Sequence, residues 1–229
     1  MRNPWLDLPS STPLTLASDA ALLQAFNLGA AKVNQYDLSL FPEPFFGSPI
    51  APVVILNLNP GLSPGDAAVH AQPGFAAMSR HSLAHSLSPY PFLHLQPTNV
   101  TPGEQWWHRR TRELVSEVGF EAVASGLSCV QYMPYHSQRF ATSSPRLPSQ
   151  AFSFHLVRQA MARQAEIVVM RSRKLWFSAV PELASYERLH FGTAPRSPYI
   201  SPGNLKSSYL AIARRLRSAA SDVEIVDYH

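Results

Sequence analysis

The fold is decided by the stretch Val53-Val54-Ile55-Leu56-Asn57-Leu58-Asn59-Pro60-Gly61. Its first four residues form a continuous apolar run, which is typical of a strand buried on both faces of a parallel sheet. Pro60 locks its own φ and drives Asn59 into an extended backbone, while Gly61 allows a positive φ or a close approach of the backbone to a ligand. The stretch therefore predicts a buried strand followed by a loop that holds a polar side chain in place.

Apolar runs alternate with amphipathic segments over the rest of the chain. The further strands are expected at residues 127–132, 167–170 and, more weakly, 188–191. The helices are expected at about 18–33, 105–118, 149–164, 175–181 and after 204. Ser18 and Asn204 are the expected N-caps of the first and last helices. Residues 41–47 and 72–103 are rich in proline and are predicted to be mostly loop.

This alternation favours a three-layer α/β/α fold around a mainly parallel sheet of roughly four strands. We expect a single domain over residues 1–229, with a helical and loop segment at about 1–50. The chain has 229 residues, of which 45% are hydrophobic, and this composition is globular. The single cysteine, Cys129, excludes a disulfide framework within the chain and is expected to be a buried apolar side chain.

The charge and hydropathy of the chain limit its partners. A formal net charge of +4 is mild, and it permits a nucleic-acid or phosphate-bearing partner without requiring one. No apolar stretch reaches the ~18 residues of a membrane span, so we expect no membrane partner and a cytoplasmic location. The oligomeric state does not follow from the sequence.

Three segments are expected to meet where ligands bind in parallel sheets, beyond the carboxyl ends of the strands. They are residues 57–65, 132–137 and 171–172. The ring of Tyr135 can stack on a base, His136 can transfer a proton, and Ser137 adds a hydroxyl. Arg171 is a candidate clamp for a phosphate or carboxylate. The alternatives are that these side chains only bond their own loop, or pair with a structural acid.

Two motif-like patterns are better explained structurally. Residues 61–65 match the G-x-S-x-G nucleophile elbow, but Pro64 lacks the N–H that such an elbow contributes to its oxyanion hole. We therefore expect Ser63 to be a helix N-cap, with Pro64 at N1. His81 and His85 would share a helix face at a zinc-like spacing, but no third ligand accompanies them. No metal and no cofactor are expected.

Two short motifs resemble those of the uracil-DNA glycosylase superfamily. Residues 57–61 are similar to the family's G-I-N-P-G, and Tyr199-Ile200-Ser201-Pro202-Gly203-Asn204 is similar to its H-P-S-P-R-N. The resemblance spans about residues 50–217 in layout and implies a glycosylase-like fold. It implies that Asn59 positions the attacking water and that Pro60 and Gly61 shape the floor of the base pocket. It also implies that Ser201 and Pro202 belong to the loop that presses on the DNA backbone beside a flipped nucleotide.

The departures from the family pattern are equally specific. Asn57 replaces the first glycine of the first motif, which narrows the pocket or adds a polar contact. Tyr199 replaces a histidine that donates to the leaving base, and His136 is the candidate substitute for this donor. Tyr199 and Asn204 are retained as substrate-binding candidates because they belong to the second motif.

The sequence leaves three functions open. The first is a nucleic-acid or nucleobase-binding protein that, in its strongest form, is a DNA-repair glycosylase hydrolysing the bond to a damaged base. The second is a catalytically degenerate nucleic-acid-binding module. The third is a small-molecule hydrolase or transferase that uses His136 and Arg171 in the same cleft.

Overall fold

A five-stranded sheet forms the centre of the computed structural model, which describes residues 1–98, 100–194 and 198–226. The strand order is β1-β3-β2-β4-β5. The strands are β1 (Phe45–Gly47), β2 (Val53–Asn57), β3 (Leu127–Gln131), β4 (Glu166–Val169) and β5 (Leu189–Phe191). Strands β2 to β5 pair in parallel, so the expected mixed α/β class with a mainly parallel sheet is confirmed.

Strand β1 corrects the prediction that residues 41–47 are only loop. It pairs antiparallel with β3 at the edge of the sheet, where Phe46 faces Cys129. Gly47 makes this pairing possible, because its φ is +95° and an added Cβ would collide with the backbone of Leu127 and Ser128. A three-residue strand with prolines close by carries no readable alternation, so the sequence pattern did not reveal it.

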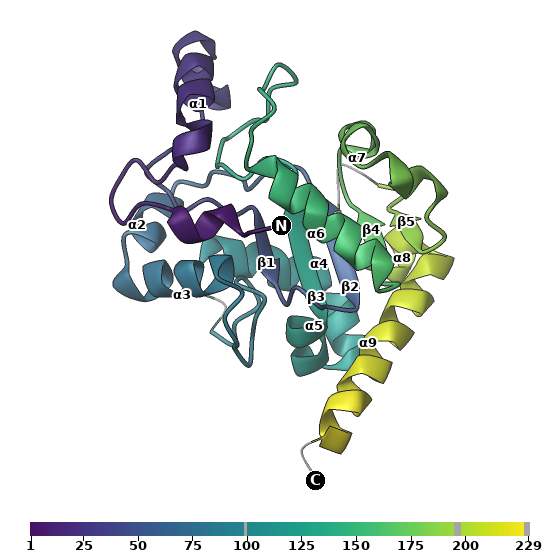
Figure 1. Ribbon diagram of the computed structural model, residues 1–229. Helices are drawn as coiled ribbons and strands as arrows, with labels where there is room; N and C mark the ends of the chain where they lie inside the picture. Colours follow the sequence, from purple (N-terminus) through teal and green to yellow (C-terminus); the bar gives the residue numbers. More distant parts are fainter. Residues whose placement is uncertain (99, 195–197, 227–229) are drawn as a thin grey trace.

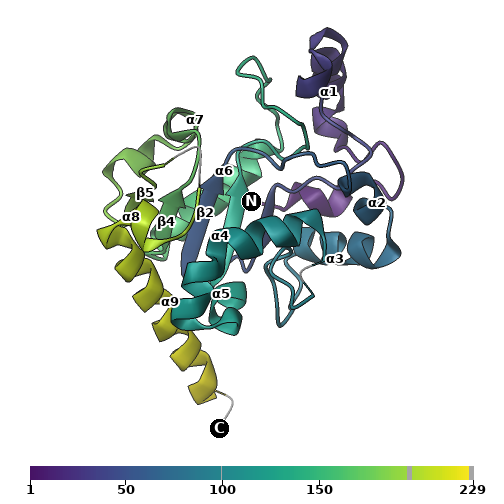
Figure 2. The same cartoon turned by 180° about the vertical axis from the view of Figure 1, so that it is seen from behind.

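Helices cover both faces of the sheet (Figures 1 and 2). The face seen in Figure 1 carries α6 (Gln150–Ala162) and α7 (Arg173–Ala179), followed by the short 3₁₀ helix η3 (Pro181–Ser185). The opposite face, seen in Figure 2, carries α4 (Pro102–Val118), α5 (Phe120–Gly126) and α9 (Ser207–Val226). No helix of the described residues is long and apolar enough to cross a membrane.

Alternate residues of the strands supply two separate cores. Val54 and Leu56 of β2 pack in one cluster with Phe152 and Trp176, whereas Val53 and Ile55 pack in the other with residues of the opposite helices, Leu114, Val123 and Ile212. Strand β2 is buried along its whole length, as its apolar run predicts. Cys129 is likewise buried and free.

The N-terminal segment extends the first of these cores. It contains η1 (Pro4–Asp7), α1 (Ala17–Gly29) and η2 (Lys32–Asn34) before β1. Its apolar side chains Trp5, Leu14 and Leu23 join the cluster that holds Val54. Helix α1 itself stands clear of the sheet in both views (Figures 1 and 2).

Several predicted caps and loops are wrong in detail. Helix α1 begins at Ala17 without a side-chain cap, so Ser18 is not its N-cap. A helix does follow Ser63, as α2 (Asp66–His70), but residues 73–83 of the segment predicted to be mostly loop form α3 (Pro73–Leu83). Ser63 does not cap α2, because its own N–H donates to Asp66 Oδ2 at 2.6 Å. The Asp66 N–H, from which the serine hydroxyl was expected to accept, donates to the Ser63 carbonyl at 3.1 Å instead.

The segment before the last helix is also organised differently from its prediction. Residues Pro202–Leu205 form the short helix α8, and Ser201 is its N-cap, accepting from the Asn204 N–H at 3.3 Å. Asn204 lies inside α8 and does not cap α9. A helix begins at this earlier Ser-Pro pair because the Ser201 hydroxyl accepts from the N3 amide while Pro202 occupies N1.

The carboxyl ends of β2, β3 and β4 lie together at one edge of the sheet. The chain passes from β3 across β2 to β4, so the strand order reverses at β2, and ligands commonly bind at such a switch point. The carbonyl of Asn57 accepts from Trp176 Nε1 at 2.9 Å and from the Tyr132 N–H at 3.2 Å. The loop after β2 is therefore anchored where it leaves the sheet.

Candidate functional site

A cavity of about 450 Å³ opens at this edge of the sheet. Its volume falls within the ~300–1,000 Å³ that is usual for small-ligand sites. Its lining includes seven predicted site residues, Asn57, Asn59, Pro60, Gly61, His136, Ser137 and Arg171. The expected meeting of the three loops is thus confirmed as geometry, and the start of α4 and helix α2 close the remaining sides.

Asn59 has a fixed amide orientation. Its Nδ2 donates to the Pro60 carbonyl at 2.8 Å and to Ser137 Oγ at 3.1 Å. The Pro60 carbonyl can only accept, so the amide nitrogen must be the atom that faces it. Oδ1 is therefore the group of Asn59 that can accept a hydrogen bond from a water or a ligand in the cavity.

Gly61 contributes space to the cavity and no special backbone geometry. It does not adopt a positive φ, so a left-handed backbone is not the reason for a glycine at this position. A Cβ added at Gly61 would meet no protein atom within 4 Å. The second reason, close approach of a ligand to the backbone, is the one that fits this open position.

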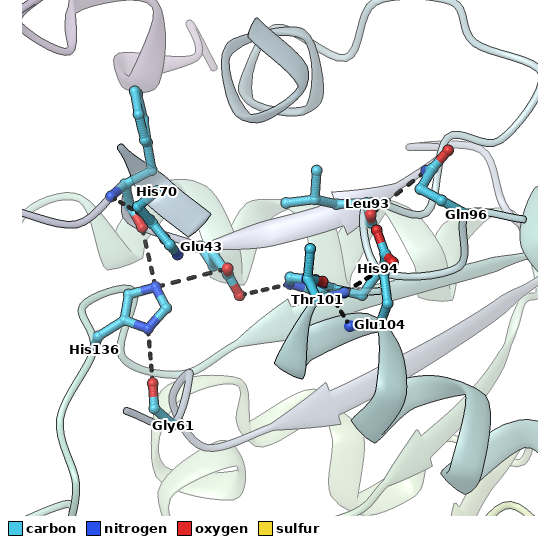
Figure 3. A network of polar contacts seen from close by, with 10 residues as sticks. Glu43, Gly61, His70, Leu93, His94, Gln96, Thr101, Glu104 and His136 are labelled. Carbon is cyan, nitrogen blue, oxygen red and sulfur yellow. Dashed lines mark hydrogen bonds and ion pairs between the residues drawn. The ribbon is translucent and has the colours of Figure 1, made fainter. Parts of the chain in front are cut away.

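His136 ties the loop after β2 to the segment before β1 (Figure 3). Its Nδ1 lies 2.7 Å from the Gly61 carbonyl, and its Nε2 lies 3.1 Å from the Phe41 carbonyl and 3.7 Å from Glu43 Oε1. Both ring nitrogens face acceptors, and only a doubly protonated imidazole can donate to both. In this arrangement His136 positions the loop, and neither of its nitrogens is turned to a ligand.

Glu43 is a buried carboxylate that the sequence interpretation missed. Its Oε2 lies 3.0 Å from His94 Nε2, and both side chains are almost fully buried. Burial opposes ionisation of Glu43, but the charges of His94, His136 and His70 together lower its pKa to about 2. Burial in turn opposes protonation of His94, yet Glu43 raises the pKa of this imidazole. The two residues therefore form a buried ion pair (Figure 3), and both belong to the lining of the cavity.

The first turn of α4 holds this pair in place. Thr101 and Glu104 form a capping box at the helix start, and Glu104 also accepts from the Val100 N–H at 2.6 Å. Gly103 follows Pro102 in the first turn, and a Cβ there would come 2.5 Å from His94 Nδ1. A glycine is thus required for the helix to lie directly over the His94 ring.

His70 is the second missed residue, and it offers a defined donor. Its Nδ1 accepts the Phe41 N–H at 3.0 Å, so the neutral ring carries its proton on Nε2. Burial lowers the pKa of His70 to about 4, and the opposing charge of Glu43 does not overcome this effect. His70 lines the cavity as a neutral imidazole at physiological pH, and its Nε2–H is the donor available to a ligand.

Glu43, His70 and His136 offer ligand atoms within 4.8 Å of one another, which raises the question of a metal. A histidine that binds a metal normally donates its other ring N–H to an acceptor. His70 has the opposite arrangement, since its Nδ1 receives an amide N–H. His136 faces carbonyl oxygens with both nitrogens. The hydrogen bonds of the cluster therefore suit proton donors better than metal ligands.

The other pair of histidines considered as metal ligands does not share a helix face. His81 lies in α3, but His85 follows the end of that helix with a φ of 52°. The ring of His85 packs on Phe45 at 4.4 Å between centroids. The expected zinc-like spacing is wrong here because the helix ends before it can place the second histidine.

Arg171 contributes a cation to the lining, and Trp106 contributes an aromatic ring. Arg171 is half-buried, and its Nε is buried without a partner among the described residues. Burial, followed by the charge of Arg110, lowers the pKa of Arg171. The indole of Trp106 is half-buried and carries the guanidinium of Arg110 over its ring at 5.0 Å.

Four predicted site residues are not among those that line the cavity. Tyr135 is fully buried, and its hydroxyl donates to Asp19 Oδ2 at 3.0 Å. Ser201 caps α8, and Asn204 bonds the Tyr199 carbonyl and the Ala194 N–H, each at 2.8 Å. Tyr199 packs on Arg110. These contacts are structural, and a ligand role for the four stays a prediction.

The missed residues carried only weak signals in the sequence. Glu43 is a lone acid between two prolines in an aromatic segment, and His94 is a lone polar residue between Leu93 and Leu95. Such isolated polar residues in apolar surroundings indicate burial with a partner, but they do not identify the partner. His70 had no comparable signal.

The fold and the cavity define an α/β protein with a cavity of small-ligand size at the carboxyl edge of its mainly parallel sheet. We compared the chain with protein-family models, with curated proteins and with solved structures, and none of the three comparisons returned a match.

Proposed function

We propose that the cavity binds a nucleobase and that the protein hydrolyses an N-glycosidic bond, as a DNA glycosylase does. The observation that carries this proposal is the fixed amide of Asn59. Both of its Nδ2 bonds are made within the protein, so Oδ1 is left to accept from a water in a cavity of nucleoside size. The resemblance of residues 57–61 to the glycosylase motif assigns the same task to Asn59.

In the proposed reaction, Asn59 Oδ1 accepts a hydrogen bond from the water and orients the water oxygen towards the anomeric carbon. A bond forms between this oxygen and the carbon, while the bond to the base nitrogen breaks and its electron pair leaves with the base. The water proton is released to solvent, and the departing base is protonated from solvent. This chemistry needs a donor that stabilises negative charge on the leaving base.

His70 suits that donor role better than His136. The neutral His70 ring carries its proton on Nε2, as the Phe41 N–H on its Nδ1 requires. A neutral imidazole can hydrogen-bond to a developing negative charge without giving up its proton. Trp106 in the same lining offers an aromatic face on which a base can stack.

The test is release of uracil, hypoxanthine or xanthine from single- and double-stranded DNA. The Asn59→Ala variant should lose on the order of 10²-fold or more in rate, because the water loses its positioning acceptor. Ser137→Ala should lose less, since the Pro60 bond still orients the amide. Asn3→Ala is a matched control, because the Asn3 amide also makes two hydrogen bonds, to the Leu83 carbonyl and from the Trp5 N–H, but Asn3 does not line the cavity. Absence of release from every substrate would refute the excision proposal.

A binding module without turnover is the second candidate, and Tyr199 favours it. This residue stands where the family has its donor histidine, and its ring packs on Arg110 instead of lining the cavity. The module would bind single-stranded DNA or RNA with an affinity that falls steeply with salt, and it would leave the bases attached. Binding measured beside base release separates the two candidates.

A further inference from the structure

We propose that Arg110 and Arg171 form a phosphate subsite beside the cavity, which binds the phosphate of the nucleotide whose base the cavity holds. The inference rests on the proposed function only for the identity of that base. The phosphate itself can belong to a polynucleotide backbone or to a free nucleotide. Neither arginine forms an ion pair with an acidic residue in the part of the chain that the structure describes.

Arg171 follows β4 and lines the cavity. It is half-buried, and its Nε is one of the buried polar atoms that lack a partner among the described residues. Burying part of a guanidinium without a carboxylate is unfavourable, and proteins usually pair such a group. A bound anion would supply this missing partner.

Arg110 is held rigidly near the same rim. Its guanidinium lies 5.0 Å from the ring of Trp106 and 4.2 Å from the ring of Tyr199. Trp106 lines the cavity, so this stack places Arg110 beside it. The Arg110 Nε is also buried without a partner among the described residues. Stacking fixes the plane of the guanidinium before any ligand binds, which favours recognition of a planar or bidentate acceptor.

The positive charges of the two arginines interact with each other. The charge of Arg110 reaches Arg171, where it adds to burial in lowering the pKa of Arg171. None of the ion pairs between residues in the described part of the chain includes either arginine. Two neighbouring cations without an acid favour a ligand with more than one anionic oxygen, and phosphate has this property.

The second sequence motif gains a physical role from this arrangement. Tyr199 stands at the position where the resembled family has a histidine, and here it stacks on Arg110. The next residue, Ile200, donates its N–H to the Arg110 carbonyl at 2.9 Å. The motif therefore holds the cation that would bind phosphate, in place of a donor to the base.

Calorimetric titration of the full chain tests the subsite with four probes: a nucleoside, its 5′-monophosphate, ribose 5-phosphate and a short single-stranded oligonucleotide. The monophosphate should bind at least about 10-fold more tightly than the nucleoside, as expected for charge-assisted hydrogen bonds. Arg110→Met and Arg171→Met should each remove most of that preference. Arg110→Lys and Arg171→Lys should retain part of it, because the charge remains while the bidentate fork is lost.

Arg146→Met is the matched control. Arg146 also stacks on an aromatic ring, that of Phe154 at 4.3 Å, but it does not line the cavity. This variant should keep the full preference for the monophosphate. Melting curves for all five variants show whether a loss of binding comes from unfolding, and the lysine variants test the subsite if a methionine variant does not fold.

The outcomes separate the subsite from the proposed function. Equal affinity for nucleoside and monophosphate in the wild type, or an unchanged preference in the methionine variants, overturns the subsite even if bases are released. Arginine-dependent binding of ribose 5-phosphate as tight as that of the monophosphate supports the subsite and contradicts base recognition. Tighter oligonucleotide binding, with a salt slope that falls by about 1 per arginine removed, identifies a backbone phosphate. Equal affinity for oligonucleotide and monophosphate identifies a free nucleotide.

Discussion

Acidification should destabilise the protein through His70, and the structure gives the size of the effect. The pKa of His70 is lowered by burial from 6.5 to about 4 in the folded chain. An unfolded chain therefore binds a proton on this ring at a pH where the folded chain does not. The free energy of unfolding is highest above pH 6.5 and falls as the pH drops from 6.5 towards 4.

The magnitude follows from the two pKa values. Linkage between them gives a loss of about 2 kcal/mol between pH 7 and pH 5 from His70 alone. His85 has a pKa lowered to about 4 by burial and acts in the same direction. His94 acts in the opposite direction, because its raised pKa gives stability that is present at low pH and lost as the pH rises. The wild-type curve is therefore a sum, and variants are needed to isolate each part.

The His70→Asn variant isolates the contribution of His70. An asparagine keeps an acceptor for the Phe41 N–H but has no group that titrates in this range. Urea unfolding at pH 7 and pH 5 should show the variant losing about 2 kcal/mol less than the wild type over this interval. With an m-value of roughly 3 kcal/mol/M, this difference is on the order of 0.6 M in midpoint.

The His85→Asn variant measures the contribution of His85 to the pH dependence of stability separately. It should remove its own share of the pH dependence and leave that of His70 intact. Identical losses between pH 7 and pH 5 in the wild type and the His70→Asn variant would refute the reasoning. In that case the pKa of His70 would be the same in the folded and unfolded chains, and burial would not keep the ring neutral below pH 6.5.

Three further predictions test the rest of the site. Glu43→Gln should lower the free energy of unfolding at pH 7 by about 3–5 kcal/mol, measured by urea titration, because His94 stays buried without its counter-charge. Gly47→Ala should lower the free energy of unfolding by on the order of 1–3 kcal/mol in the same assay, because a Cβ at Gly47 collides with the backbone. Gly61→Ala should change it by less than about 1 kcal/mol, because a Cβ at Gly61 meets no protein atom within 4 Å. Addition of Zn²⁺ should leave the melting temperature unchanged within about 1 °C, because neither His70 nor His136 presents a free lone pair. A rise in melting temperature that saturates with Zn²⁺ concentration would contradict this prediction.

Much of the framework was predictable from local pattern. The apolar run Val53–Leu56 predicts a strand buried on both faces, and the structure confirms it. The Asn-Pro-Gly sequence after it predicts a loop with a fixed polar side chain, and Asn59 has that property. The loops after β2, β3 and β4 meet because parallel strands place their carboxyl ends at one edge. Each of these inferences depends on residues that are neighbours in the chain or repeat with a regular period.

The chemistry of the cavity was decided by contacts between distant segments. Glu43, His70, His94 and His136 lie on four separate segments, and no period links them. The sequence names His136 as the candidate donor, but the carbonyls of Gly61 and Phe41 occupy both of its nitrogens. The Phe41 N–H gives His70 the free donor instead. Sequence pattern determines which faces of a segment are buried, whereas the state of a titratable side chain depends on the groups that tertiary folding brings against it.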